Sequence, residues 1–352
     1  MNKKFWALLL SICLFLCGCN KNDKDTVMKE FSKKINNSDS YYLTGTLEMF
    51  NNENSHNYDI KVSYTKENNF KVSLKNQANN HEQIILRNND GVYVVTPSLN
   101  KSFKFQSEWP YNNSQAYWLQ VILSDLEKDK EMDFVSNEKE YVLTSKVNYS
   151  NNAELEKQRV TIDKNSVVKM VEVLDKTGNV KIKMIFDEID YDAKFDEDYY
   201  KLESNVSSEV ESTKETASIE DISYPMYIPV NTTLSTQDKL ETATGERVIL
   251  TFSGENPFML IEETASVSDE FVTIPVNGEL VMLGDSIGIM DETSLTWHTN
   301  NREYYLVSST LDTASLLEEA FEITDLYQGY ELKGIVSRKK QIVPRIMNAI
   351  EK

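Results

Sequence analysis

The sequence predicts an α+β protein that is mostly antiparallel sheet and is divided into two domains. From Tyr41 onward, short apolar runs alternate with Asn-rich turns, which is the pattern of strands joined by hairpins. Before them, Val27, Phe31 and Ile35 recur every four residues and mark one face of a helix. The stretch from Asn205 to Asp221 is rich in Ser, Thr and Glu and separates two apolar regions. Because such a stretch buries too little to offset its ordering entropy, it predicts a linker.

The first residues have the order of parts of a secretory signal. Lys3 and Lys4 precede an apolar run from Phe5 to Leu16, which ends at Gly18 and Cys19. A helix that crosses a bilayer needs roughly 20 apolar residues, so this run is too short for a permanent membrane span. We therefore expect it to be removed.

The end of that run resembles a lipobox, the processing signal of bacterial lipoproteins. Leu16, Gly18 and Cys19 occupy its positions. The resemblance implies that the Cys19 thiol carries a diacylglyceryl group and that residues 1–18 are a signal peptide. Residues 19–25 would be the lipidated (palmitate-type) terminus and its spacer, held on the extracytoplasmic face of the cell membrane. The alternative is an uncleaved signal anchor with a buried thiol.

The first domain is expected over residues 26–204. It begins with a helix over 26–35, and the pattern loses its period of two over Ser114–Leu126, which predicts a second helix. Two hairpins are well marked. Ile84–Leu86 and Val92–Thr96 flank a turn at 88–91, and Val167–Leu174 and Val180–Ile189 flank a turn at 177–179.

Residues 205–221 are the predicted linker, with a surface loop inside one large domain as the alternative. A smaller α+β domain follows over residues 222–325. Its expected strands are Arg247–Phe252, Phe258–Glu262, Glu279–Leu283, Ser294–Trp297 and Tyr304–Ser308. Asp312 or Thr313 is the expected N-cap of a closing helix. Residues 326–352 form a basic tail, which could pack against the acidic domains, touch the membrane surface or bind a partner.

Composition excludes some classes of function. The chain has 56 acidic and 37 basic residues, a formal net charge of −19. Nucleic-acid binding depends largely on Lys and Arg that neutralise phosphates, so we expect no DNA or RNA partner. The charge itself is most simply a device for solubility, with steering of cations as the alternative. After processing, no cysteine except Cys19 remains, so we expect no disulfide and an ordinary apolar core.

No motif for catalysis stands out. His56, His81 and His298 are isolated in sequence and lack the spacing of metal ligands, so we expect no metal. The sequence also lacks a phosphate-binding G-x-x-x-x-G-K loop and a dinucleotide fingerprint, so we expect no cofactor and no enzyme activity. Carboxylates are dense, and a pair of them could act on a glycan. Such runs are usually solvated faces. The two densest are Asp187, Glu188 and Asp190, and Asp196, Glu197 and Asp198. Trp109 and Tyr111, beside Pro110, either grip a ligand at the surface or plug a loop.

The stretch from the lipobox to about Leu202 resembles the LolA-like superfamily, and more closely the YdcC-type sporulation lipoproteins of Gram-positive spore formers. The resemblance lies in Gln83–Asn88, Gly91–Ser102, Phe105–Pro110 and Ser114–Tyr117. A weaker resemblance, in Tyr224-Pro225, Pro229, Gly254 and Trp297, links residues 223–321 to a small domain of unknown function on Gram-positive lipoproteins.

The resemblance implies an antiparallel half-barrel wrapped over helices, and it supplies no catalytic residues. Two functions follow from it. In the first, the concave face of the half-barrel binds a lipid or a lipidated partner such as a lipoprotein, in sporulation or envelope assembly. In the second, the interior is filled by side chains and the protein is a scaffold that positions or activates a cell-wall or spore-cortex enzyme. The two differ in whether the concave face is open.

Overall fold

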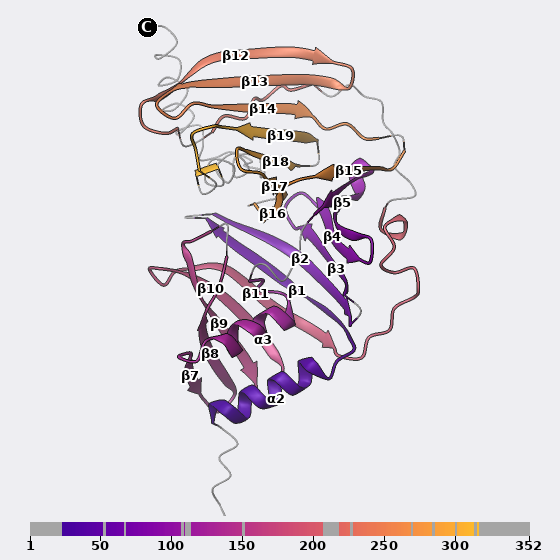
Figure 1. Cartoon of the computed structure of the whole chain (residues 1–352), viewed down its shortest axis with the longest axis vertical. Coiled ribbons are helices and arrows are strands. Elements are labelled where there is room, and N and C mark those ends of the chain that lie inside the picture. Colours follow the sequence, from indigo (N-terminus) through magenta and orange to yellow (C-terminus); the bar gives the residue numbers. More distant parts are fainter. Residues whose placement is uncertain are drawn as a thin grey trace, which may run out of the picture.

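The computed structural model describes residues 23–51, 54–66, 68–106, 109, 114–149, 152–206, 218–225, 228–268, 270–283, 286–299, 301–312 and 315–316. Two β-sheets dominate it, and helices are few (Figure 1). Among the described residues, no helix is long and apolar enough to cross a bilayer. The predicted predominance of antiparallel sheet is therefore confirmed.

The larger sheet has twelve strands in the order β15-β6-β5-β4-β3-β2-β1-β11-β10-β9-β8-β7. Every neighbouring pair is antiparallel except β15 with β6. The strand bounds are β1 Ser40–Asn51, β2 Asn54–Thr65, β3 Asn69–Asn76, β4 Glu82–Asn88, β5 Gly91–Thr96, β6 Lys101–Phe105, β7 Asp133–Ser136, β8 Glu140–Lys146, β9 Leu155–Asp163, β10 Val168–Asp175, β11 Val180–Asp190 and β15 Val272–Val276. Both predicted hairpins, β4–β5 and β10–β11, are present.

Helix α2 (Lys24–Asn36) confirms the predicted first helix. Asp23 caps it, because its Oδ1 accepts a hydrogen bond of 2.7 Å from the Thr26 backbone N–H. The predicted stripe of Val27, Phe31 and Ile35 is fully buried against the sheet. Burial of this stripe, rather than helix propensity, holds α2 in place.

Helix α3 (Leu119–Lys128) begins later than the sequence predicts. A helix from Ser114 is wrong, because Trp118 has an extended backbone, with φ −106° and ψ 110°. Leu119, Ile122 and Leu126 of α3 are buried in the same core as α2, so both helices lie on one face of the larger sheet. We call it the inner face. The structure also has two short 3-10 turns, Pro97–Leu99 and Glu203–Asn205. Ser315 and Leu316 are helical as well, and Asp312 Oδ1 accepts a hydrogen bond of 2.9 Å from the Ser315 backbone N–H, as expected of the predicted N-cap.

The opposite, outer face of the larger sheet has two different coverings. Over β9, β10, β11 and β1, ion pairs join neighbouring strands: Arg159 with Glu172 at 2.8 Å, and Lys183 with Glu48 at 3.1 Å. Over β4 and β5, a second apolar cluster forms, and the segment around Tyr200 covers it. The outer face is therefore salt-bridged on one side and apolar on the other.

The smaller sheet has seven antiparallel strands in the order β12-β13-β14-β19-β18-β17-β16. Their bounds are β12 Thr232–Thr242, β13 Gly245–Gly254, β14 Phe258–Thr264, β16 Glu279–Met282, β17 Ile287–Met290, β18 Ser294–His298 and β19 Arg302–Val307. The sequence predicted five of these and missed β12 and β17. β12 escaped notice because most of its residues are polar and exposed.

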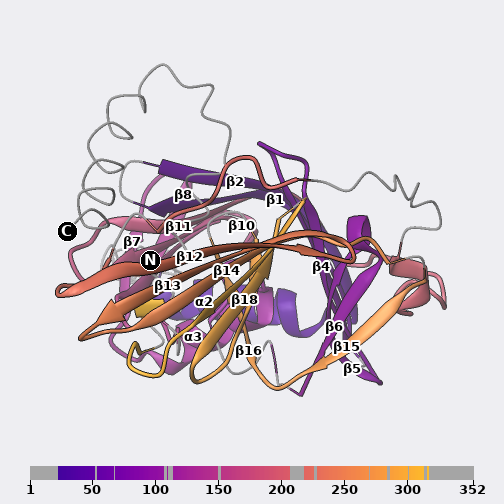
Figure 2. The same ribbon diagram turned by 90° about the horizontal axis from the view of Figure 1, so that it is seen from above.

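The two sheets are joined more closely than a linker between separate domains would require. β15 comes from the predicted second domain, yet it pairs in parallel with β6 of the first. Leu280 of β16 and Ile287 of β17 are buried in the core of the larger sheet. Figure 1 shows β16 and β17 on the side of the smaller sheet that faces the larger sheet, and Figure 2 shows β15 alongside β6 and β5 from above. The boundaries of the two domains stay a prediction, since most of the linker, residues 207–217, lies outside the described residues.

Gly45 allows β1 and β11 to approach closely. It lies where the β1–β11 register shifts. A Cβ on Gly45 would collide with the Ile185 carbonyl oxygen and lie 2.7 Å from Cε of Met184. Only glycine fits this position without moving β11.

Replacing Gly45 with Ala should therefore lower the free energy of unfolding by about 2 kcal/mol or more, because the collision is with backbone. Urea denaturation followed by circular dichroism measures the change. Thr46→Ala, one residue along the same strand, is the control and should cost less than about 1 kcal/mol. Equal stability of Gly45→Ala and wild type would show that β1 and β11 separate without cost.

Candidate functional site

The inner face of the larger sheet, where the resemblance places a ligand, is covered by the chain's own aromatic residues. We call Trp109, Tyr117 and Trp118 the aromatic plug. Their exposed fractions are 2%, 2% and 1%. All three come from the segment between β6 and α3, and all three are buried in the core of the larger sheet. Of the two alternatives for Trp109, the surface grip is wrong and the plug is correct, while Tyr111 lies outside the described residues.

The plug is packed ring against ring. The Trp109 ring lies 4.8 Å from Phe70 and 6.4 Å from Trp118, measured between centroids, and Trp118 meets Tyr64 edge-on at 5.7 Å. The Arg87 guanidinium also donates a hydrogen bond to the Trp109 carbonyl oxygen. Edge-to-face contacts of this kind add to the burial of large apolar surfaces. The plug is therefore a stable part of the core.

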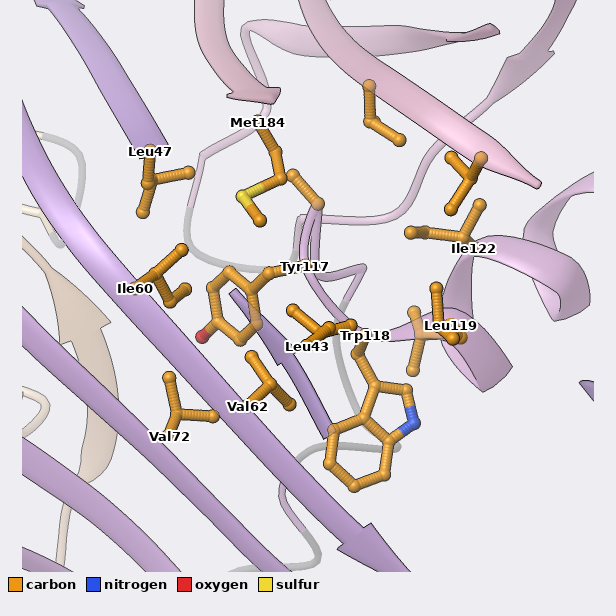
Figure 3. Close-up of a cluster of buried hydrophobic side chains, with 14 of the residues drawn as sticks. Leu43, Leu47, Ile60, Val62, Val72, Tyr117, Trp118, Leu119, Ile122 and Met184 are labelled. Atoms are coloured by element: carbon orange, nitrogen blue, oxygen red, sulfur yellow. The ribbon is translucent and has the colours of Figure 1, made fainter. Parts of the chain in front are cut away.

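Tyr117 is the unusual member of the plug. Figure 3 shows its ring among Leu47, Ile60, Val62 and Met184, with the hydroxyl directed at the strands that carry Ile60 and Val72. Among the described residues, that hydroxyl has no hydrogen-bond partner. Burial raises the pKa of Tyr117 well above its ordinary value, so the phenol stays protonated. A buried donor without an acceptor costs about 1–3 kcal/mol, which makes this a place where a polar atom would bind favourably.

Ser114, in the same segment, belongs to a small cluster of polar side chains. The Ser114 hydroxyl donates a hydrogen bond of 2.7 Å to Asp125 Oδ2 and accepts one of 2.8 Å from the Asn148 backbone N–H. Burial raises the pKa of the Asp125 carboxyl, although the Ser114 hydrogen bond opposes this. The pair ties α3 to the strand connection at Asn148. The Ser114 hydroxyl already donates one hydrogen bond and accepts another. The Ser114–Asp125 pair is therefore better suited to fixing the position of the segment than to nucleophilic chemistry.

The other residues that the sequence singled out do not assemble into a site. Among the described residues, no three His, Cys, Asp or Glu side chains are placed to hold a metal ion. The two carboxylate runs, at 187–190 and 196–198, lie largely at the surface, which agrees with solvated faces. Leu16, Gly18 and Cys19 lie outside the described residues, so lipid attachment stays a prediction.

Sequence reasoning missed a buried polar junction between the two sheets. Lys101 of β6 and Glu303 of β19 form an ion pair of 2.5 Å, and both side chains are almost fully buried. His298 lies beside them, with its ring 4.9 Å from that of Phe103 and its Nε2 3.8 Å from Glu303. Nearby, the Gln83 side-chain oxygen accepts a 2.6 Å hydrogen bond from the Ile287 backbone N–H. Because each partner is about 200 residues away in sequence, no local pattern could reveal the junction.

Comparison with known proteins supplies the family. The family model "Sporulation protein YdcC-like" matches residues 2–200. Sporulation protein YdcC of Bacillus subtilis (strain 168) is 30% identical over 339 residues, which cover 95% of this chain and 99% of that protein. The chain belongs to the YdcC-like sporulation protein family. The predicted resemblance to YdcC-type proteins is thus confirmed.

Several solved structures show partial likeness to this YdcC-like chain. MucB is 11% identical, with a TM-score of 0.33 over 87% of this chain and 98% of its own. A LolA superfamily protein from Nitrosomonas europaea is 10% identical, with a TM-score of 0.30 over 51% of this chain and 98% of its own. The complex of the CwlD amidase from Clostridioides difficile with the GerS lipoprotein is 19% identical, with a TM-score of 0.21 over 49% of this chain and 96% of the matched one.

The junction between the sheets should make the YdcC-like chain sensitive to acid. Burial lowers the pKa of His298 from 6.5 to about 4 and outweighs the opposing effect of Glu303; Lys101 and His81 lower it further. The unfolded chain therefore takes up a proton near pH 6.5 that the folded chain refuses until about pH 4. The folded state is therefore favoured fully above about pH 6.5, where His298 is neutral in both states. This contribution to the free energy of unfolding is lost as the pH falls toward about 4.

Replacing His298 with Gln should remove this part of the acid sensitivity. Between about pH 7 and pH 5, the wild-type free energy of unfolding should fall by about 1–2 kcal/mol more than that of His298→Gln. Urea titrations at the two pH values measure the difference. His56→Gln, at a buried histidine on β2, is the control for histidine removal alone. Parallel pH profiles for wild type and His298→Gln would contradict the assignment.

Proposed function

We propose that this YdcC-like protein is a lipid-anchored, extracytoplasmic scaffold in sporulation, which has no catalytic activity of its own and positions or activates a cell-wall or spore-cortex enzyme. The packing of the inner face carries this proposal. In our interpretation the larger sheet is a half-barrel of the LolA-like kind, whose inner face α2, α3 and the aromatic plug fill. A filled interior leaves the outer surfaces and sheet edges as the places where a partner binds.

The lipid anchor would also set the orientation of the protein relative to the membrane. Cys19 precedes the N-cap residue Asp23 by a short spacer, so α2 and the larger sheet would lie nearest the membrane. In Figure 1 the smaller sheet is at the end of the molecule opposite α2. Under this proposal the smaller sheet, with its long strand β12, faces away from the bilayer and toward the wall. Two acyl chains on Cys19 hold such a protein stably without a transmembrane helix.

The second candidate is binding of a lipid or a lipidated partner on the inner face. The observation in its favour is the Tyr117 hydroxyl, which is buried among apolar side chains without a hydrogen-bond partner among the described residues. An ester or amide carbonyl beside an acyl chain would satisfy it. This function requires the aromatic plug to move, because Trp109 and Trp118 are buried in the same core as Tyr117 and help to close it.

Native mass spectrometry with lipid extraction separates the two candidates. The sample is residues 20–352, purified without detergent and then incubated with membrane lipids. The scaffold predicts the mass of the bare chain before and after incubation. A stoichiometric acyl-bearing mass that disappears in Tyr117→Phe, but persists in the control Tyr42→Phe at a half-buried position of β1, would overturn the scaffold and favour lipid binding.

The anchor itself is tested separately. Cys19→Ala removes the thiol that the lipobox presents for acylation, so the chain should leave the membrane fraction or keep its signal peptide uncut. Fractionation of cells followed by immunoblotting measures both results. Cys13→Ala, in the predicted signal peptide, is the matched control and should behave as wild type. Normal processing and full membrane retention of Cys19→Ala would exclude lipid anchoring through this residue.

A further inference from the structure

The four edges of the two sheets differ in how well they are protected. In the larger sheet, edge strand β7 has only four residues, and edge strand β15 contains Pro275, which lacks a backbone N–H. In the smaller sheet, edge strand β16 lies against the larger sheet, with Leu280 in its core. Short strands, prolines and coverings of this kind are how proteins prevent edge-to-edge pairing.

β12 has none of these protections. It is an edge strand of eleven residues, most of them exposed, and it pairs only with β13 among the described strands. It contains neither proline nor glycine. One irregularity, between Leu234 and Thr236, leaves Thr236–Thr242 as a regular open edge. Such an edge presents unpaired backbone groups to another strand.

Some side chains of this regular segment are satisfied within one chain: Gln237 accepts a hydrogen bond of 2.6 Å from the Tyr224 hydroxyl, and Lys239 donates one of 2.9 Å to the Ile219 carbonyl oxygen. Leu240 and Glu241 are not. Leu240 is 49% exposed. Glu241 lies directly opposite Glu246 of β13, although like charges in that arrangement repel. Lys239 forms an ion pair of 2.9 Å with Glu246, whereas Glu241 has no ion pair among the described residues. The edge therefore lacks an apolar partner for Leu240 and a cation for Glu241.

We propose that β12 pairs with β12 of a second copy of the chain, antiparallel, about a two-fold axis through Leu240. In this register Leu240 meets its own copy, and Lys239 of each chain lies opposite Glu241 of the other. Asp238 falls opposite Thr242. One symmetric contact thus covers the exposed leucine and gives each Glu241 a cation.

The other symmetric registers of the regular segment are worse. An axis through Asp238, Lys239 or Glu241 sets that charge against its own copy. An axis through Thr236 or Gln237 brings the irregularity at Ser235 into the pairing. An axis through Thr242 sets Leu240 opposite Thr244 and Glu241 opposite Ala243, so neither gains a suitable partner. The contact joins only a few residues on each side, so it is weak for proteins free in solution. A shared membrane would raise the effective concentration of the two copies, and the contact would then be populated.

Sedimentation velocity of residues 20–352, which contain no cysteine, tests the pairing over concentrations from about 5 to 500 μM. We expect a monomer–dimer equilibrium with a dissociation constant on the order of 100 μM. Lys239→Glu places an acidic side chain opposite Glu241 on both sides of the axis and should raise that constant at least about tenfold. The double change Lys239→Glu with Glu241→Lys restores opposite charges across the axis and should return it to within about threefold of wild type.

Two further variants guard against indirect effects. Lys239→Glu also breaks the ion pair with Glu246 inside the chain. Leu240→Lys leaves that ion pair intact but sets two cations against each other at the two-fold axis. Leu240→Lys should therefore also abolish the dimer. Lys183→Glu breaks an ion pair of the larger sheet and should leave the dimer unchanged. A monomer at every concentration, or a double variant as impaired as Lys239→Glu, would overturn the proposal. Thermal melts establish that each variant is folded.

Discussion

The inner face of the larger sheet must be covered, and most of the structure serves that need. Strands of this length expose a broad apolar surface, and burial of such a surface is the main stabilising term in folding. Two helices, α2 and α3, cover part of it, the aromatic plug covers another part, and β16 and β17 add residues from the smaller sheet. The last of these come from the C-terminal half of the chain, so the smaller sheet supplies part of the core that covers this surface.

The way in which the face is covered bears on function. A fold that closes its interior with its own tryptophans uses its largest apolar surface for stability, and it has to recognise other molecules elsewhere. Tyr117 is the exception, since its hydroxyl is buried without a partner among the described residues. The same residue is therefore both part of the plug and the best indication that a polar ligand atom could bind beneath it.

The charged side chains are paired in some parts of the protein and unpaired in others. On the outer face of β9, β10, β11 and β1, opposite charges lie on neighbouring strands and neutralise each other. At the junction, Lys101 and Glu303 are buried as a pair, and such a pair is costly to break from either side. β12 differs from both, because Glu241 faces Glu246 with no ion pair of its own among the described residues. β12 therefore carries an acidic side chain without an ion pair on an open sheet edge.

The sequence by itself determined the local features: the helix with Val27, Phe31 and Ile35, the two hairpins and five strands of the smaller sheet, because periodicity and turn residues act over a few positions. It also determined the family, through continuous motifs. Only the tertiary structure decided that Trp109 is buried, that β15 joins the larger sheet and that Lys101 meets Glu303. These depend on contacts between residues far apart in the chain, and no local pattern encodes them. β12 was missed for a related reason, since a solvated edge strand has no buried face to create a period.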